Sequence, residues 1–189
     1  IVQGGLDDAL RQRSAEELTA LPFDGFAVGG LSVGESPPQL QAAMGRYAPL
    51  LPDDRVRYVM GIGRPADVVA AIAAGFDLFD SVMPTRNGRH GTLFTSRGVV
   101  NLRNRKWLDA TEPVDPACGC PACTGWSAGA LRHLIKAGEG LGRSLGSLHN
   151  IHFMHELVAA ARQAIVEGRF EAFAAQWREA DPALQADRP

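Results

Sequence analysis

The sequence lacks the features of a secreted or membrane protein. Only three of its 189 residues are cysteines, and all of them fall within residues 118–123, so they cannot form a framework of paired disulfides. There is no run of about 20 apolar residues, as a membrane span needs, and no basic-then-apolar N-terminus typical of a signal peptide. We therefore expect a soluble, cytoplasmic protein without a membrane partner.

The chain also lacks a strong charge of either sign. Its 19 basic and 21 acidic residues give a net charge of −2, which argues against a polyanion-binding surface spread over the whole molecule. Any contact with a polyanion must therefore be local. Apolar residues make up 46% of the chain, enough to bury a core, so we expect one domain or part of a larger one.

Strand-like and helical segments alternate in the first part of the chain. Apolar runs predict strands at residues 1–5, 23–30, 56–61 and 76–83, and the first of them looks like the end of a strand cut from something longer. Helices are expected between them, at residues 6–21, 36–50 and 65–75. In the first helix, Leu6, Leu10, Leu18 and Leu21 form an apolar side, and Arg11 is expected to face solvent.

The second part has a different texture. The pattern predicts a hairpin of residues 91–95 and 98–102, followed by a loop rich in proline and cysteine at 113–125. Helices should then extend from Trp126 to Asp181, interrupted by a glycine-rich break at 138–146 and followed by a frayed tail at 182–189.

Alternating strands and helices indicate parallel βαβ units, and four such units make half of an eight-stranded α/β barrel. An open doubly wound sheet is the alternative, but Gly61-Ile62-Gly63 lacks the third glycine of the dinucleotide-binding fingerprint. In a barrel, the chemistry lies at the carboxyl ends of the strands. Those ends carry groups that suit a planar polar ligand: Gln3, Gly29-Gly30, Met60 and Asp80.

The three cysteines have the spacing of a metal site. Cys118, Cys120 and Cys123 form C-x-C-x-x-C, with Gly119 and Pro121 allowing a tight turn. Tetrahedral zinc needs one more ligand, which histidine can supply, and such a site has no open position for water, so it should be structural. Spacing alone leaves three downstream candidates open: His149, His152 and His155.

Asp80 is a candidate for catalysis. It follows an apolar segment and precedes Ser81 and, farther on, Arg86, so its carboxylate should be partly desolvated and near a cation. A nucleophile or general base and an ion-paired structural aspartate fit this setting equally well. Asp77, within the same predicted strand, is a rival candidate.

The segment from Ser81 to Leu108 contains no acidic residue. Six basic residues fall within it: Arg86, Arg89, Arg97, Arg103, Arg105 and Lys106. An acid-free basic segment can bind phosphate groups, although most such runs are solvated faces. The pattern alone makes phosphate binding a hypothesis.

Five motifs occur in order along the chain: VQGG at 2–5, FAVGGLSVGE at 26–35, YVMG at 58–61, FDSVMPTR at 79–86, and the cysteine cluster followed by His149-Asn150. Together they resemble the bacterial tRNA-guanine transglycosylases of the queuine tRNA-ribosyltransferase family, over essentially the whole chain. The resemblance implies the second half of a TIM-type (β/α)8 barrel with a C-terminal zinc-binding subdomain. The implied parts are a half barrel at 1–85, a basic hairpin and zinc loop at 86–125, and C-terminal helices at 126–189.

The resemblance also implies a reaction, in which guanine is exchanged for preQ1 (7-aminomethyl-7-deazaguanine) at the wobble position of tRNA, in queuosine biosynthesis. Asp80 would attack C1′ of the guanosine and form a covalent ester, from which preQ1 displaces it. Two displacements on one carbon retain its stereochemistry.

Binding roles follow from the same resemblance. Gln3 and the Gly30 amide would bind the polar edge of the purine, and Met60 would cover a ring face. The Leu31 carbonyl and Glu35 would favour the aminomethyl group of preQ1, and Val33 in place of glycine indicates the bacterial substrate. Two arginines would grip the anticodon loop of tRNAs with G-U-N anticodons: Arg86 and Arg89. His149 would complete one structural zinc site per chain, and the protein would be a homodimer.

The family's other half, which holds further base-binding groups, is absent from this sequence. We therefore expect open strand edges and no base exchange by the chain alone. The alternative function is a non-catalytic, zinc-stabilised module for tRNA binding or assembly, derived from the enzyme.

Overall fold

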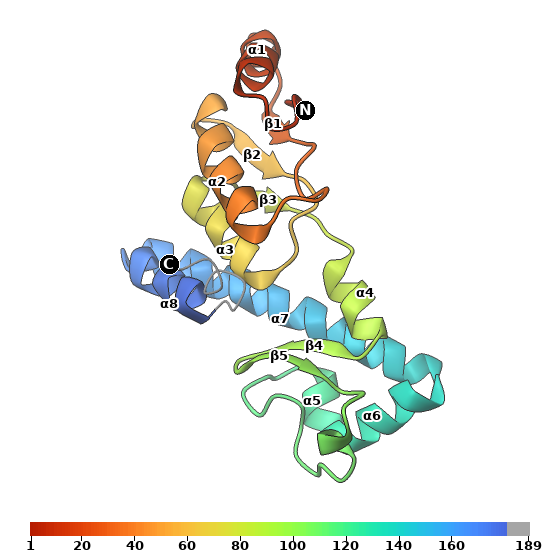
Figure 1. Cartoon of the computed structure of the whole chain (residues 1–189). Coiled ribbons are helices and arrows are strands. Elements are labelled where there is room, and N and C mark those ends of the chain that lie inside the picture. Colours follow the sequence, from red (N-terminus) through yellow and green to blue (C-terminus); the bar gives the residue numbers. More distant parts are fainter. Residues whose placement is uncertain (181–189) are drawn as a thin grey trace, which may run out of the picture. The chain divides into compact units, whose positions relative to one another are not determined.

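The computed structural model describes residues 1–180 and shows an α/β protein (Figure 1). The chain forms two compact units, one of Ile1–Ser81 with the chain from Ala161 onward and one of Val82–Ala160. We call these the sheet unit and the cysteine unit. Within residues 1–180, no helix combines the length and apolar character needed to cross a membrane. The expected tail at 182–189 lies outside the described residues.

The sheet unit is built on three parallel strands. Its sheet has the order β1-β2-β3, with strands at Gly25–Val28, Val56–Val59 and Leu78–Phe79. Val2 extends the ladder through a parallel bridge to Val28. The helices of this unit are α1 (Asp8–Thr19), α2 (Pro37–Tyr47), α3 (Pro65–Ala74) and α8 (Phe170–Ala180), with a 3-10 turn at Ala48–Leu50. The predicted alternation of parallel strands and helices is confirmed, and the half barrel stays a prediction.

Local sequence explains where these helices begin and end. The Asp7 carboxylate accepts the Leu10 amide at 3.0 Å and caps α1, and Ser36 and Gln39 form a capping box at the start of α2. Gly75 ends α3 in the left-handed conformation with φ of 96°, where a side chain would be strained. The predicted starts and ends of α2 and α3 are therefore close to the observed ones.

The predicted faces of the first helix were wrong at three of the four leucines and at Arg11. Leu6, Leu10 and Leu21 are 51%, 56% and 47% exposed, whereas Arg11 is fully buried. The reason lies outside the helix: the carbonyl oxygens of Val2 and Gly5 accept hydrogen bonds from Arg11 and hold it inside.

The cysteine unit contains the predicted hairpin. Strands β4 (Thr92–Thr95) and β5 (Gly98–Asn101) pair antiparallel around Ser96 and Arg97. The other elements are α4 (Met83–Arg89), a 3-10 turn at Arg105–Trp107, α5 (Pro121–Gly125), α6 (Ala128–Ala137) and all but the last turns of α7 (Gly140–Val166). Its core is apolar and includes two of the cysteines: Leu93, Leu102, Val114, Cys120, Ala122, Cys123, Ala128, Leu131, Ile135 and Leu145.

The predicted strand at 76–83 is shorter than expected. Strand β3 contains only Leu78 and Phe79, and α4 already begins at Met83. Pro84 lies in the first turn of that helix, where its missing amide hydrogen removes no hydrogen bond. The residues after Phe79 therefore lead into a helix, where the sequence pattern had predicted a longer strand.

The predicted glycine-rich break was also wrong for most of its length, because α7 is helical from Gly140 onward. A Cβ atom on Gly146 would lie 2.4 Å from the Gly88 carbonyl oxygen, and one on Gly142 would lie 2.8 Å from the Cβ of Leu134. These glycines bring α7 close to α4 and α6. They permit close helix packing, and the helix does not break at them.

Alanine at Gly146 should therefore destabilise the protein, by about 2 kcal/mol or more, because the backbone of α4 must move away. Gly140→Ala on the same helix is the matched control, since a Cβ there meets nothing within 4 Å. Urea unfolding of both variants measures the difference. Equal midpoints for the two would contradict the close-packing explanation.

Candidate metal centre and active site

The three cysteines and His149 converge in the cysteine unit. Their Sγ and Nδ1 atoms lie within 4.8 Å of one another, and Nδ1 is 3.8, 3.4 and 3.3 Å from the sulfurs of Cys118, Cys120 and Cys123. Zinc at its usual bond lengths to tetrahedral S and N ligands would separate those atoms by about 3.6 Å. The four residues can therefore hold a metal ion without large rearrangement.

A hydrogen bond on the far side of its ring from the sulfurs fixes the position of His149. Its ring is fully buried on α7, and Nε2 lies 2.7 Å from the Phe94 carbonyl oxygen of β4. A carbonyl can only accept, so Nε2 carries the proton and the lone pair of Nδ1 points at the sulfurs. The structure thus brings His149 to the cysteines, whereas His152 and His155 lie outside the cluster.

Asn150, the next residue, ties the same region together. It is fully buried, its Oδ1 accepts the Phe94 amide at 3.0 Å, and its Nδ2 donates to the carbonyls of Pro84 and Thr92 at 2.8 and 3.0 Å. Asn150 therefore joins α7 to β4 and to α4. Sequence reasoning noted it only as the neighbour of His149.

The ionisation of the cluster reflects its crowding. The hydrogen bond from Cys123 lowers the pKa of the Cys120 thiol to about 3, with His149 acting in the same direction. Burial raises the pKa of Cys118, and the hydrogen bond to Cys120 raises that of Cys123. Burial opposes protonation of His149, but its contacts with Cys120 and Phe94 raise its pKa overall. These shifts arise because three sulfurs and one ring nitrogen lie close together, an arrangement of donor atoms that suits a bound cation.

Asp80 directly follows β3 in the sheet unit, and its carboxylate is exposed. One oxygen, Oδ1, accepts both the Tyr58 hydroxyl at 2.6 Å and the Gly61 amide at 2.9 Å. The hydrogen bonds from Tyr58 and then Gly61 lower the pKa of Asp80 below its ordinary value, against the opposing effect of burial. The carboxylate is therefore ionised at neutral pH, and its second oxygen, Oδ2, takes part in neither of these hydrogen bonds.

The rival Asp77 has a structural role. Its Oδ2 accepts the Arg57 amide at 2.8 Å, and its own amide donates to the Arg57 carbonyl at 2.7 Å. Both hydrogen bonds align the start of β3 with β2. Tyr58 was not among the predicted site residues, although it lies in the YVMG motif at the end of the neighbouring strand.

Gln3 lies against two glycines at the end of β1. A Cβ on Gly29 would be 2.8 Å from the Gln3 Nε2, and one on Gly30 would be 2.8 Å from its Oε1. The Gln3 side-chain amide can therefore occupy this place only because positions 29 and 30 are glycine. The structure thus brings together the predicted base-binding pair, Gln3 and Gly30, at one edge of the sheet.

The other residues predicted to bind the base lie in the loops that follow β1 and β2. Leu31 is buried, Val33 is 80% exposed, and the Glu35 carboxylate accepts the Val33 amide at 2.8 Å. Met60 is half-buried, and its amide donates to the Val28 carbonyl at 3.2 Å. These contacts shape the 31–35 loop and join Met60 to the end of β1.

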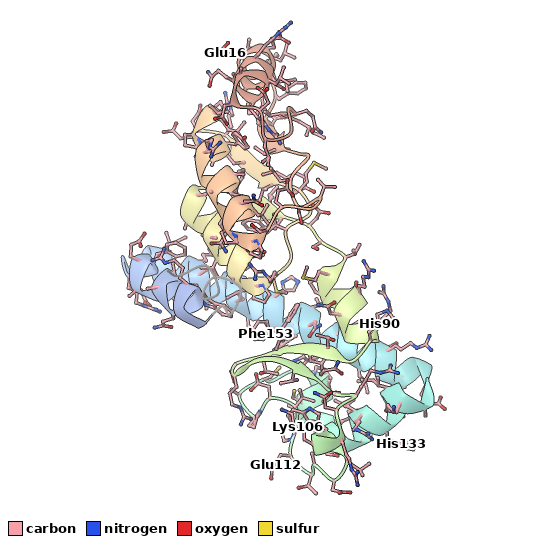
Figure 2. All side chains as sticks on the ribbon, viewed as in Figure 1. Glu16, His90, Lys106, Glu112, His133 and Phe153 are labelled. Atoms are coloured by element: carbon pink, nitrogen blue, oxygen red, sulfur yellow. The ribbon has the colours of Figure 1, made fainter. Side chains whose placement is uncertain are left out.

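Arg86 and Arg89 lie on α4 and are exposed. The other basic residues of the acid-free segment are also exposed, and the Lys106 ammonium lies 5.0 Å from the centre of the Trp107 ring. Figure 2 labels Lys106 with His90 and His133, which are exposed and outside the metal cluster. The cysteine unit therefore presents cations to solvent.

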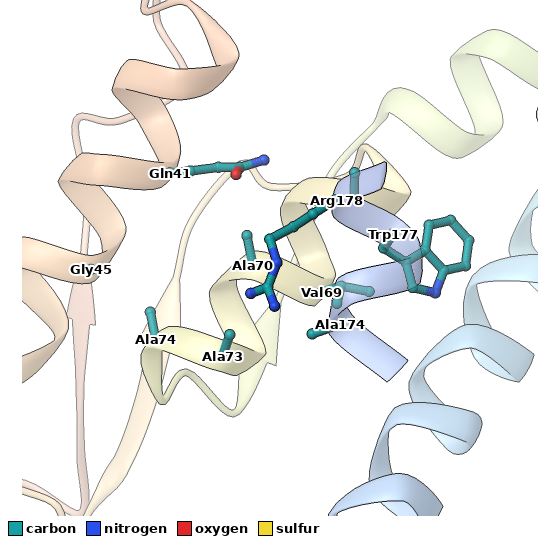
Figure 3. Close-up of a pocket in the computed structure, with 10 residues that line it drawn as sticks. Gln41, Gly45, Val69, Ala70, Ala73, Ala74, Ala174, Trp177 and Arg178 are labelled. Carbon is teal, nitrogen blue, oxygen red and sulfur yellow. The ribbon is translucent and has the colours of Figure 1, made fainter. Parts of the chain in front are cut away.

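A separate pocket of about 280 Å³ lies between α2, α3 and α8 (Figure 3). Alanines make up much of its wall, and Gln41 and Arg178 extend toward it from different helices. In the described part of the chain, none of the predicted site residues lines it. This pocket is therefore separate from the residues that the sequence predicts for base binding.

Comparison with known proteins gives one consistent result. A family model described as queuine tRNA-ribosyltransferase matches residues 1–183. A queuine tRNA-ribosyltransferase of Thiobacillus denitrificans is 51% identical over 177 residues, which are 94% of this chain and 48% of the relative. Relatives of the same name from Sphingopyxis alaskensis and Methylobacillus flagellatus are 51% and 46% identical, over 95% and 98% of this chain and 49% and 50% of theirs. The chain spans about half the length of these relatives.

Proposed function

Because the chain belongs to the queuine tRNA-ribosyltransferase family, we propose that it forms the nucleophile-bearing half of an enzyme that exchanges guanine for preQ1 in tRNA. The exchange takes place at the wobble position, as a step of queuosine biosynthesis in the cytoplasm. The observation that carries the proposal is the state of Asp80, an exposed and ionised carboxylate with one oxygen held by two donors.

The reaction has two displacements on one carbon. The Oδ2 of Asp80 attacks C1′ of the guanosine, the bond from C1′ to N9 breaks, and guanine leaves with the electron pair and takes up a proton. N9 of preQ1, after losing its proton, then attacks C1′ and releases Asp80 as a carboxylate. Tyr58 and Gly61 stabilise the charge that returns to Asp80 in this second step.

The base lies, in this proposal, at the edge formed by Gln3 and Gly30. The Gln3 amide and the Gly30 backbone amide bind the polar edge of the purine, and Met60 covers one face of the ring. Glu35 and the Leu31 carbonyl bind the aminomethyl group, which carries a positive charge. The contact between Gln3 and the two glycines supports this arrangement, because it fixes the orientation of the amide.

Arg86 and Arg89 bind the anticodon loop of tRNAs with G-U-N anticodons. Their exposure on α4 supports this role, since phosphate binding requires accessible cations. The complete protein acts as a homodimer.

The metal is one structural zinc ion per chain, held by Cys118, Cys120, Cys123 and His149. Four protein ligands leave zinc no open position, so when bound it supplies stability and no chemistry. Through His149 and Asn150 the site stabilises β4 and the helix that carries Arg86.

The test uses a completed protein, in which this chain is joined to the half of the Thiobacillus denitrificans relative that it does not match. We expect this protein to incorporate labelled guanine into tRNA, and the chain alone to incorporate none. A completed protein that folds, binds tRNA and fails to exchange guanine would instead indicate the non-catalytic binding module.

Removing the Tyr58 hydroxyl tests whether its hydrogen bond lowers the pKa of Asp80 and speeds the reaction. In the completed protein, Tyr58→Phe deletes the hydrogen bond that most lowers the pKa of Asp80, so the pKa should rise. Because the reaction needs the carboxylate, the acid limb of the pH–rate profile should move to higher pH. The rate at neutral pH, where Asp80 stays ionised, should fall about tenfold because the returning carboxylate loses the hydrogen bond from Tyr58. Tyr47→Phe is the matched control, since the Tyr47 hydroxyl bonds Asp8. An unchanged acid limb in Tyr58→Phe would contradict this role.

A further inference from the structure

Arg11 is the most unusual buried group of the sheet unit. Its side chain is fully buried on α1, although a buried guanidinium keeps its charge. Within residues 1–180 no carboxylate forms an ion pair with it, and its Nη2 has no hydrogen-bond partner. Burying a charge in this way is costly, so its presence needs an explanation.

The contacts of Arg11 surround Gln3. Nε donates to the Gly5 carbonyl and Nη1 to the Val2 carbonyl, each at 2.9 Å, so one guanidinium holds the chain on both sides of Gln3. The backbone amide of Gln3 also donates to the Ser14 hydroxyl of the same helix at 3.2 Å. Helix α1 therefore sets the path of the segment that carries Gln3.

Arg11 is also linked to Gly29 and Gly30 at the end of β1. The Val2 carbonyl that accepts Arg11 also accepts the Gly29 amide at 3.1 Å. A Cβ on Gly30 would lie 3.6 Å from the Arg11 Nη2 and 2.8 Å from the Gln3 Oε1. The guanidinium thus lies directly beside the edge where Gln3 and Gly30 meet.

The ring of Tyr47 also lies against the Arg11 guanidinium. The Cζ of Arg11 lies 4.8 Å from the centre of the Tyr47 ring, and the Tyr47 hydroxyl donates to Asp8 at 3.1 Å. Burial lowers the pKa of Arg11, and the charges of Tyr47 and Glu35 act in the opposite direction. The ring offsets part of the cost of burial and leaves Nη2 on the side of Gly30.

We propose that Arg11 is the positioning residue of the base-binding edge, holding Gln3 and the Gly29-Gly30 backbone in place and setting a positive charge behind the polar edge of the purine. This inference rests on the proposed function. The positive charge of Arg11 attracts the partly negative carbonyl oxygen of the base. Its two hydrogen bonds hold the backbone on either side of Gln3, whose side-chain amide binds the same base.

The test compares Michaelis constants in the completed protein. Arg11→Met removes the charge and both hydrogen bonds, and should raise the KM for guanine about tenfold or more while the KM for tRNA stays within about twofold. Arg11→Lys keeps the charge but cannot hold two carbonyls in the same fork, so it should give an intermediate value. Arg46→Met is the matched control: Arg46 also lies over Tyr47, at 6.0 Å, but is exposed and pairs with Asp8.

A thermal melt of each variant separates positioning from stability. The inference is overturned if the KM for guanine in Arg11→Lys and Arg11→Met stays within about twofold of the unsubstituted value. It is equally overturned if the constants for guanine and tRNA rise together. Should Arg11→Met not fold, Arg11→Lys decides by the same criterion. Absence of exchange in the unsubstituted completed protein would overturn the proposed function itself, which is a separate result.

Discussion

Asp80→Asn in the completed protein is expected to slow guanine exchange by about 10⁴-fold, because an amide cannot act as the nucleophile. The covalent tRNA adduct should vanish with it. Binding of tRNA should stay within about threefold, since the substitution changes neither the shape of the residue nor the exposed arginines of α4. Filter binding measures tRNA binding, denaturing gels of tRNA mixed with each protein detect the adduct, and incorporation of labelled guanine gives the rate of exchange.

Asp77→Asn is the matched control, because it changes the same group three residues away. Asp77 aligns the start of β3 through Arg57, so its loss should cost about 1 kcal/mol of stability and leave the adduct intact. If Asp80→Asn keeps the adduct and Asp77→Asn loses it, the assignment of the nucleophile is wrong.

His149→Ala is expected to remove the metal and unfold the cysteine unit. Zinc bound by such ligand sets contributes on the order of 10 kcal/mol to folding, more than a small unit can lose. The zinc content measured by elemental analysis should fall from one ion per chain to nearly none. The far-ultraviolet circular dichroism signal of the helices should decrease as well. Stripping the unsubstituted protein with a chelator should have the same effect.

His152→Ala provides the comparison. His152 lies one turn along α7 and outside the cluster, so its loss should leave zinc content and folding unchanged. One equivalent of zinc in His149→Ala would show that His149 is not needed to hold the metal. A stable, folded protein without zinc would show that the site has no structural role.

Local features of this chain were predictable because nearby residues determine them. The hairpin of β4 and β5 follows from two short strand patterns around Ser96 and Arg97, and Gly75 marks the end of α3. The cysteine cluster was predictable from spacing, but its histidine was not. Three histidines on one helix have similar spacing, and it was the family resemblance that selected His149, which the structure places 3.3–3.8 Å from the sulfurs.

Features that depend on contacts between distant segments were missed. Gly146 suggested a broken helix because its own sequence cannot show that Gly88 lies against it. Arg11 suggested a solvent-facing charge because its carbonyl partners belong to a turn that precedes the helix. Tyr58 became a candidate only when the register of β2 and β3 brought its hydroxyl to Asp80. In each case tertiary contacts outweighed the local pattern.

The most direct test of the proposed mechanism is to locate the attached nucleotide. The completed protein is mixed with tRNA, digested with nuclease and protease, and analysed by mass spectrometry for a peptide that carries a ribose ester. We expect the ester on Asp80, and its loss when preQ1 is added before digestion. An ester on Asp77 or another residue, or exchange of guanine without any ester, would contradict the account.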